Sequence, residues 1–288
     1  MNEGNSLTGS REAASEWIVR SLWVGGPLSE LEWVCLASFR HHGAQVELFT
    51  DNLGRKVPEG VRLRDCREVL GSKLPRYGPR AGRHAGSLAM AGNIARLKTL
   101  FREGGWWVDT DVVCLAPFHS IDNGYRFAWE DLENGPKGEG KINCAVIRFP
   151  KRHRIIRTLM RRARWPLLGS PWESFKERKH RFIKLFDTLW DPWNVPWSSS
   201  AGPIAYTLAL DYYGLKQEAM PPATFYPVHY SEWDRIPALS EEDFAAFAKE
   251  SFALHLWAEM YRSNGVDKGE AIRKSVWAQP YLAGFSKA

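Results

Sequence analysis

Apolar and polar positions follow two periodicities along the chain, which indicate strands and helices in turn. The runs WIVRSLWVGG (17–26) and AQVELFTDN (44–52) are short, apolar and closed by turn residues, which is typical of strands. Between them, residues 29–43 carry apolar side chains at helical spacing and end at a glycine, as helices often do. Strand, helix and strand in succession predict an α/β sheet.

The same two patterns continue through the rest of the chain. A strong helical pattern covers 87–105, and the apolar run EGGWWVDTDVV (103–113) that follows predicts a strand. Further strands are predicted at 127–131 and 141–149, helices at 153–164 and 200–214, and a short apolar element at 252–261. No internal repeat or low-complexity linker interrupts the sequence. We therefore expect one domain over 17–288, with a basic helical insertion at 151–200.

Composition agrees with a folded protein of a reducing compartment. The chain has 288 residues, 44% of them hydrophobic, which is enough for a sizeable core. No stretch approaches the ~18 uninterrupted apolar residues of a membrane span. Residues 1–16 lack the apolar core of a signal peptide and are predicted to be a disordered lead. The four cysteines are scattered and mostly lie in apolar runs, which disfavours a zinc site or disulfides and favours a cytoplasmic location.

The net charge of +6 is concentrated in one segment. Residues 151–184 contain twelve lysines and arginines against Glu173 and Glu177. Such a run is most often a solvated helical face. It would equally suit an anionic partner, such as membrane headgroups, a phosphorylated lipid carrier or a nucleic acid. The charge pattern alone leaves these alternatives open.

Asp109 and Asp111 are the candidate chemical groups. Two residues apart on a strand, they should point to the same face, where their like charges call for a cation. Carboxylate oxygens at the carboxyl end of an α/β strand suit Mg²⁺ or Mn²⁺ bound to a diphosphate. Two alternatives remain: a pair of exposed polar residues, or a dehalogenase-type phosphatase with Asp109 as nucleophile. The phosphatase would need a later paired acidic motif, and no Gly-Asp or Asp-Asp pair follows in the sequence.

The surrounding residues narrow this choice. The run AGNIARLKTLFREGGWWVDTDVVCLAPF (91–118) resembles the DXD-containing sugar-transferase family. This family includes bacterial capsular and lipopolysaccharide sugar transferases and the yeast initiating mannosyltransferase; the glucosylating clostridial toxins are more distantly similar. The positions that match the family pattern are Arg96, Gly104, Gly105, Trp107, Asp109 and Asp111. Asn93 departs from it, because the family commonly has aspartate there.

The resemblance implies a fold and a reaction. The fold is a GT-A-like nucleotide-sugar-binding sandwich, of class α/β, with a mostly parallel central sheet. The reaction is metal-dependent transfer of a sugar from a nucleoside diphosphate sugar, with a UDP-sugar favoured and the anomeric configuration retained. Asp109, Asp111 and Arg96 would be catalytic, and Mn²⁺ or Mg²⁺ would stabilise the diphosphate leaving group.

Three further segments resemble the family more weakly. SLWVGGP (21–27) places Trp23 near the nucleotide base, KINCAVIRF (141–149) gives Asn143, and FALHLWAEMY (252–261) gives His255. The implied donor-binding residues are Trp23, Asn93, Arg96, Trp107 and Asn143, and the implied metal ligands are Asp109, Asp111 and His255. A strand tryptophan and a lone histidine are, however, often purely structural.

The partners follow from the same resemblance. The acceptor would be a glycan, a lipid-linked molecule or a protein, and polysaccharide biosynthesis would be the setting. Residues 151–184 would make peripheral contact with an anionic membrane at its inner face, and no nucleic-acid partner is expected. A basic membrane- or nucleic-acid-binding protein remains the non-enzymatic alternative.

Overall fold

A mostly parallel sheet forms the centre of the molecule. The structure, a computed structural model, describes residues 17–77, 86–135, 140–164, 170–176, 178–179 and 201–285. In this part of the chain the central sheet has five strands in the order β3-β2-β1-β4-β8. Their bounds are β1 Ile18–Trp23, β2 Gln45–Thr50, β3 Val61–Asp65, β4 Gly105–Val108 and β8 Val146–Phe149. The first four run parallel, and β8 pairs antiparallel with β4. The predicted α/β class with a mostly parallel sheet is confirmed.

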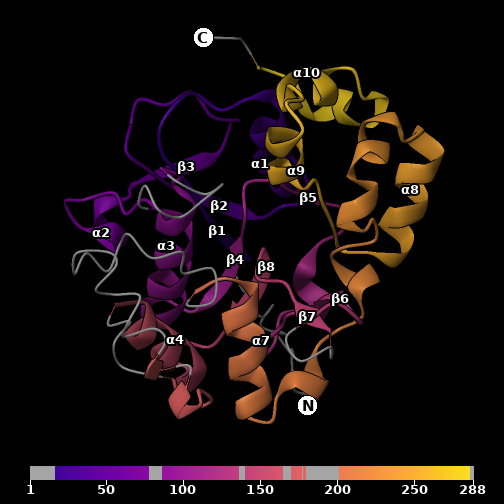
Figure 1. The fold of residues 1–288 in the computed structure, drawn as a ribbon. Coiled ribbons are helices and arrows are strands. Elements are labelled where there is room, and N and C mark those ends of the chain that lie inside the picture. The colour runs from indigo at the N-terminus through magenta and orange to yellow at the C-terminus, as the bar shows by residue number, and fades with distance from the viewer. Residues whose placement is uncertain are drawn as a thin grey trace, which may run out of the picture.

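Helices α1 (Glu30–His41) and α3 (Ala89–Arg102) provide the crossovers of this sheet. The two helices belong to separate hydrophobic clusters, one on each side of the sheet. The strands feed both clusters because successive side chains on a strand point to opposite faces. Trp106, for example, belongs to the α1 cluster, whereas Trp107 belongs to the α3 cluster. The result is a sandwich of helices around one sheet (Figure 1).

Two strands predicted as continuous are each divided between two sheets. The predicted strand 103–113 stops at Val108, turns over Asp109–Asp111, and resumes as β5 (Val112–Cys114). Strand β5 leaves the central sheet to pair with β9 (Ala253–His255). The predicted strand 141–149 likewise divides into β7 (Lys141–Ile142) and β8. Strand β7 pairs with β6 (Trp129–Asp131), whereas β8 pairs with β4. The apolar runs were continuous because all of these strands are buried, so the pattern held no sign of the break.

The remaining helices surround these sheets. The α-helices are α2 Arg67–Leu70, α4 Arg154–Arg164, α7 Pro203–Tyr212, α8 Glu241–Glu250, α9 Ala258–Ser263 and α10 Lys268–Arg273. The 3₁₀ segments are Phe118–Ile121, Lys216–Glu218, Pro222–Thr224, Tyr230–Ala238 and Val276–Tyr281. Helices α3, α4 and α7 contact one another in sequence, and the C-terminal α10 contacts α1 (Figure 1). The apolar element predicted at 252–261 consists of strand β9 followed by helix α9.

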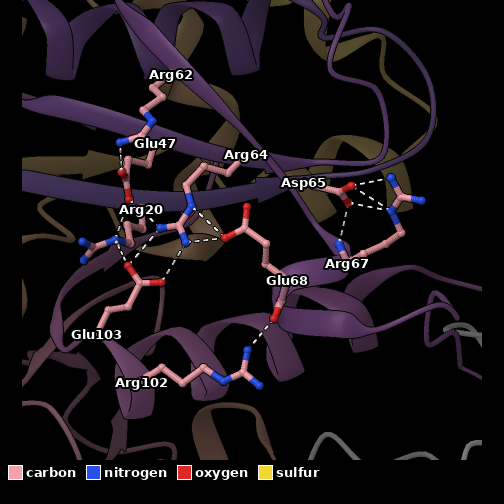
Figure 2. A network of polar contacts seen from close by, with 9 residues as sticks. All are labelled: Arg20, Glu47, Arg62, Arg64, Asp65, Arg67, Glu68, Arg102 and Glu103. Atoms are coloured by element: carbon pink, nitrogen blue, oxygen red, sulfur yellow. Dashed lines mark hydrogen bonds and ion pairs between the residues drawn. The ribbon is translucent and has the colours of Figure 1, made fainter.

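A network of charged side chains ties β1, β2 and β3 to α2 and to the end of α3 (Figure 2). At its centre the buried carboxylate of Glu47 accepts hydrogen bonds from Arg20 at 2.8 Å and from Arg64 at 2.9 Å. Arg64 also bonds Glu103 and Glu68. The cross-strand register allows this arrangement, because Arg20 lies opposite Glu47. The network therefore fastens three parallel strands and two helices together.

Some of the segments predicted from the sequence fall outside the described residues. The predicted lead at 1–16 lies outside the described residues, as do 165–169, 177 and 180–200 of the predicted basic insertion. The helix at its start is α4, as predicted. All four cysteines are free and buried, in agreement with the sequence. Within the described ranges no helix is both long and apolar enough to cross a membrane.

Candidate functional site

The two aspartates lie in a turn that joins two sheets. Asp109 directly follows β4 and Asp111 directly precedes β5, so both lie at the carboxyl edge of the parallel strands. Ligands of α/β sheets bind at this edge. The premise that one strand places both carboxylates on one face was wrong, because residues 109–111 do not belong to a strand. Each carboxylate instead has its own set of partners.

Asp109 is held by a buried arginine and by a tryptophan. The Nη2 group of Arg96, which is 4% exposed, donates to both oxygens of Asp109 at 2.7 and 2.8 Å. The indole Nε1 of Trp107 donates to the same carboxylate at 2.6 Å. Burial disfavours the charged guanidinium, but the Asp109 carboxylate outweighs it and the pKa of Arg96 is raised. The Asp109 side chain keeps 30% of its surface exposed, so it is fixed and still accessible.

Asn93 joins the same cluster from α3. Its Oδ1 accepts a hydrogen bond from Nη1 of Arg96 at 2.9 Å, since the two residues are three apart on one helix face. Trp107 is almost fully buried, and Arg96 lies over its ring at 5.7 Å. Sequence reasoning assigned these three residues to the donor site. The structure brings all three to Asp109, with Trp107 acting there as a support for the carboxylate.

Asp111 faces the C-terminal part of the chain. Its Oδ2 lies 3.2 Å from Nε2 of His255 and accepts a hydrogen bond from the backbone N–H of Ala258 at 3.1 Å. Burial would raise the pKa of Asp111, but the charge and hydrogen bond of His255 lower it to about 2. Burial would likewise lower the pKa of His255, whereas the Asp111 carboxylate raises it. Asp111 is therefore ionised at neutral pH and lies against the imidazole of His255.

An unusual backbone conformation at Trp257 makes the contact with Ala258 possible. Trp257 has φ 55° and ψ 49°, in the left-handed region that bulky residues rarely adopt. This conformation turns the chain from β9 into α9 and directs the N–H of Ala258 to Asp111. The indole N–H of Trp257 donates to the carbonyl of Val228 at 3.0 Å, which holds the turn in place. The strain is thus located where the chain reaches the candidate site.

Asn143 lies in the turn between β7 and β8 and is buried. Its Nδ2 donates to Glu130 Oε2 at 2.8 Å, and its Oδ1 accepts from the backbone N–H of Ala145 at 2.7 Å. Glu130, in β6, had no place in the sequence interpretation. A paired acidic dipeptide at the end of a strand, as in FAWED, was the available sign of it, but such pairs are common at strand ends.

Trp23 ends β1 and is half-buried. The Nζ of Lys268, the first residue of α10, lies 5.0 Å from the centre of its ring. Lys268 also forms an ion pair with the buried Glu32 of α1, and its positive charge contributes to the lowered pKa of Asp111. Sequence reasoning missed Lys268, since a single lysine before a short helix carries no recognisable pattern.

The predicted three-ligand metal site is only partly assembled. Asp111 and His255 meet, whereas the carboxylate of Asp109 is directed to Arg96. In the ranges that the structure describes, no group of three or more His, Cys, Asp or Glu side chains is arranged to hold a metal ion. The Nδ1 of His255 is buried and has no hydrogen-bond partner there. Two of the three predicted ligands are therefore placed together.

Comparison with known proteins identifies related sequences. Residues 215–281 match a family model described as the alpha 1,4-glycosyltransferase conserved region. This region includes His255 and Lys268, while Asp109 and Asp111 precede it. The lactosylceramide 4-alpha-galactosyltransferase of Pongo pygmaeus is 22% identical over 193 residues, which cover 67% of this chain and 76% of that enzyme.

Two solved structures are similar to this chain at low sequence identity. The UDP-bound glycosyltransferase domain of the YGT toxin is 9% identical, with a TM-score of 0.44, over 95% of this chain and 94% of that one. The catalytic domain of the alpha-toxin from Clostridium novyi is 10% identical, with a TM-score of 0.44, over 94% and 83% of the two chains. The family match and the lactosylceramide 4-alpha-galactosyltransferase confirm the resemblance to sugar transferases and support a glycosyltransferase enzyme.

Proposed function

We propose that this chain is a metal-dependent glycosyltransferase that uses a nucleoside diphosphate sugar, with UDP as the favoured nucleotide. The meeting of Asp111 and His255 is the observation that supports this most directly. Their facing atoms are 3.2 Å apart, close to the ~3 Å between neighbouring ligands of an octahedral ion with bonds of about 2.1 Å. Carboxylate oxygen and neutral imidazole nitrogen suit Mn²⁺, and carboxylate oxygen suits Mg²⁺. The donor set therefore fits the ion that the resemblance implies.

The residues of the site have different roles in the proposed reaction. Asp111 and His255 would hold a divalent ion, which would supply positive charge to stabilise a departing diphosphate. Arg96 keeps Asp109 in place, and the N–H of Ala258 orients Asp111. Trp23, Asn93 and Asn143 remain the proposed donor contacts. We infer retention of the anomeric configuration, as the resemblance implies.

The proposed acceptor is a glycan, a lipid-linked molecule or a protein. The name of the curated relative points to a glycolipid, lactosylceramide. Exposed basic side chains on α4 and the exposed ring of Phe175 are suited to lipid headgroups. Arg157 and Arg161 are exposed on α4, and Phe175 is 83% exposed beside further lysines and arginines. Basic side chains with an exposed aromatic ring favour contact with an anionic membrane. We propose this contact, at the cytoplasmic face, and no nucleic-acid partner.

The central test is the Asp111→Ala variant. Donor hydrolysis or transfer in the presence of Mn²⁺ should fall by roughly 10²–10³-fold, because the leaving group loses its electrostatic stabilisation. Asp65→Ala is the matched control, since Asp65 ends β3 at the same edge of the sheet but pairs with Arg67. That control should keep wild-type turnover. Unchanged turnover in Asp111→Ala would contradict the proposed function.

The nucleotide is identified by thermal stability. We expect a UDP-sugar with Mn²⁺ to raise the Tm of the wild-type protein more than GDP- or CDP-sugars do, because binding to the folded state stabilises it. The shift should be lost without the metal and in Asp111→Ala. A larger Tm shift with a GDP-sugar would change the proposed nucleotide from UDP to GDP but leave the proposed reaction class unchanged.

A further inference from the structure

A chain of hydrogen bonds links a buried ion pair to the backbone of Asp109. It runs from Lys141 through Glu130, Asn143 and Ala145. We infer that Glu130 is a positioning residue of the active site, which sets the location of Asp109 through Asn143. The inference rests on the proposed glycosyltransferase function and adds to it a residue that contacts neither aspartate directly.

The first link is the carboxylate of Glu130. Glu130 is 7% exposed, yet both of its oxygens have a partner. Oε1 lies 2.5 Å from Nζ of Lys141, and Oε2 accepts from Nδ2 of Asn143 at 2.8 Å. A buried carboxylate is costly unless it is paired and hydrogen-bonded, so the group is tied to these two partners. Because Glu130 is buried and both of its oxygens are bonded to protein groups, we assign it a role through these partners.

The second link is the side-chain amide of Asn143. Since Nδ2 must face the Glu130 carboxylate, Oδ1 faces the other way and accepts the N–H of Ala145 at 2.7 Å. This bond from a side chain to the backbone two residues later forms an Asx-turn. Residues 143–145 lie between β7 and β8 and belong to neither strand. The Asn143 side chain therefore helps to define the shape of a segment that belongs to neither strand, in addition to the backbone bond from the N–H of Asn143 to the carbonyl of Ala128 at 3.2 Å.

The third link reaches the candidate site. The carbonyl of Ala145 accepts the N–H of Asp109 at 2.8 Å. This bond continues the antiparallel pairing of β4 and β8 one step beyond Val108 and Val146. Asp109 is thus fixed at two points: its carboxylate by Arg96, and its backbone by the turn that Glu130 shapes. Catalytic groups misplaced by ~1 Å can lose on the order of 100-fold in rate, so this fixation matters to the reaction.

The first test needs no substrate. Hydrogen exchange of the Asp109 amide, followed by mass spectrometry of peptides within 105–115, is compared in wild type and Glu130→Ala. We expect exchange at least ~10-fold faster in the variant, since the Asp109–Ala145 bond opens more often. Glu47→Ala is the control, because Glu47 is equally buried and paired with arginines but belongs to the network of Figure 2, which contains none of the residues that link Glu130 to Asp109. Wild-type exchange at Asp109 in Glu130→Ala overturns the inference.

Glu130→Gln covers the case in which the alanine variant does not fold. Glutamine keeps the shape and one acceptor oxygen for Asn143 but loses the ion pair with Lys141. We expect an exchange rate at Asp109 between those of wild type and Glu130→Ala. If Glu130→Gln folds and exchanges like wild type, the ion pair with Lys141 does not contribute, and the inference that the Glu130 carboxylate sets the location of Asp109 is wrong.

The second test measures turnover in a double-mutant cycle. Glu130→Ala should lower kcat by about 10–100-fold with a change in donor KM below about threefold, as expected for lost positioning. The Glu130→Ala/Asn143→Ala double variant should be no slower than Asn143→Ala alone, because the two residues act in series. If the losses of kcat in the two single variants multiply in the double variant, Glu130 and Asn143 do not act in series, and the inference is contradicted. A wild-type protein inactive with UDP-, GDP- and CDP-sugars would reject the proposed function, and the exchange result would then decide the positioning inference separately.

Discussion

Asp109 and Asp111 are two residues apart, but they depend on different parts of the chain. Asp109 is bound to Arg96 of α3, whereas Asp111 is bound to His255 at the end of β9. A substitution near one carboxylate should therefore affect the two aspartates unequally. At the scale of single residues the site is best understood as two half-sites that share one turn.

Arg96→Lys tests the half-site of Asp109. A guanidinium can reach Asn93 and Asp109 at the same time with two nitrogens, and a single ammonium cannot reproduce this fork. We expect kcat/KM for the donor to fall by roughly 10–100-fold, corresponding to about 1.4–2.7 kcal/mol of transition-state stabilisation. Initial rates at varied donor concentration give the value. Arg102→Lys, on the exposed end of the same helix, serves as the control and should keep wild-type kinetics.

The residues that sequence alone identified share one property: they belong to a short local motif. Arg96, Asp109 and Asp111 lie within one run of the chain, and His255 lies in a recognisable apolar segment. Glu130 and Lys268 could not be found in this way, because their partners are distant in sequence and were brought close only by folding. Trp257 lies in the same apolar segment as His255, but its left-handed backbone accompanies a hydrogen bond to the distant carbonyl of Val228 and could not be predicted.

At the scale of elements, the turn from α3 into β4 determines where the first half-site lies. Gly104 has φ +69°, and a Cβ there would come within 2.5 Å of the backbone nitrogen of Lys151. Both features require glycine, since the neighbouring atoms belong to the backbone and cannot rotate away. By contrast, a Cβ on Gly92, inside α3, would meet nothing within 4 Å.

These two glycines give a matched pair of substitutions. Gly104→Ala should lower the free energy of unfolding by about 1–3 kcal/mol, because of the strained backbone conformation. Gly92→Ala should raise it by roughly 0.5–1 kcal/mol, because alanine favours the helix. Urea denaturation followed by circular dichroism measures both. Equal effects of the two substitutions would contradict the assigned backbone conformation.

Local apolar periodicity predicted helices α1, α3, α4 and α7 and strands β1, β2 and β4, whereas α2, α8 and α10 were not predicted. The periodicity did not predict where β4 ends and β5 begins, nor that β7 and β8 belong to different sheets. The side chains on both sides of each break are buried and apolar, so the run looks uniform. Only the pairing with β9 and β6 determines the break, and that pairing is tertiary. Strand β3 was missed because its charged side chains, including Arg62 and Arg64, interrupt the apolar pattern.

At the scale of the whole molecule, the network around Glu47 makes stability depend on pH. Burial would raise the pKa of Glu47, but hydrogen bonds from Arg64 and Arg20 lower it below its ordinary value of 4.5. A carboxyl group with a lowered folded-state pKa stabilises the protein above its unfolded-state pKa, and this stabilisation is lost as the pH falls through the folded-state value. The effect should be present at pH 7 and fade in the acid range below 4.5.

Glu47→Gln tests this linkage. At pH 7 the variant should be less stable by about 1.5–3 kcal/mol, since it loses charge-assisted hydrogen bonds to two arginines. On acidification from pH 5 towards pH 3, the difference in free energy of unfolding between wild type and variant should shrink. Denaturation curves at several pH values provide the measurement. A difference that stays constant over this range would mean that Glu47 does not titrate as described.

The proposed membrane contact also belongs to the whole molecule, since it depends on the uneven charge. Replacing Arg157 and Arg161 by alanine should weaken binding to phosphatidylserine-containing vesicles by about 25-fold, at about 1 kcal/mol per basic residue. Co-sedimentation at low and high salt measures this. Arg262→Ala, which removes an exposed arginine paired with Glu259, should bind like wild type. Equal binding of all variants would reject the α4 surface as the contact.

The pairing of β5 with β9 also has a consequence for the order of events during synthesis. Asp109 can take up its contacts with Arg96 once residues up to the end of β8 are available, but the partners of Asp111 come from residues 255–258. Because the N-terminal part of a chain emerges first, the ribosome will have made most of this protein before the second carboxylate has a partner. Nascent chains stopped before β9 should therefore be folded around the central sheet and catalytically silent.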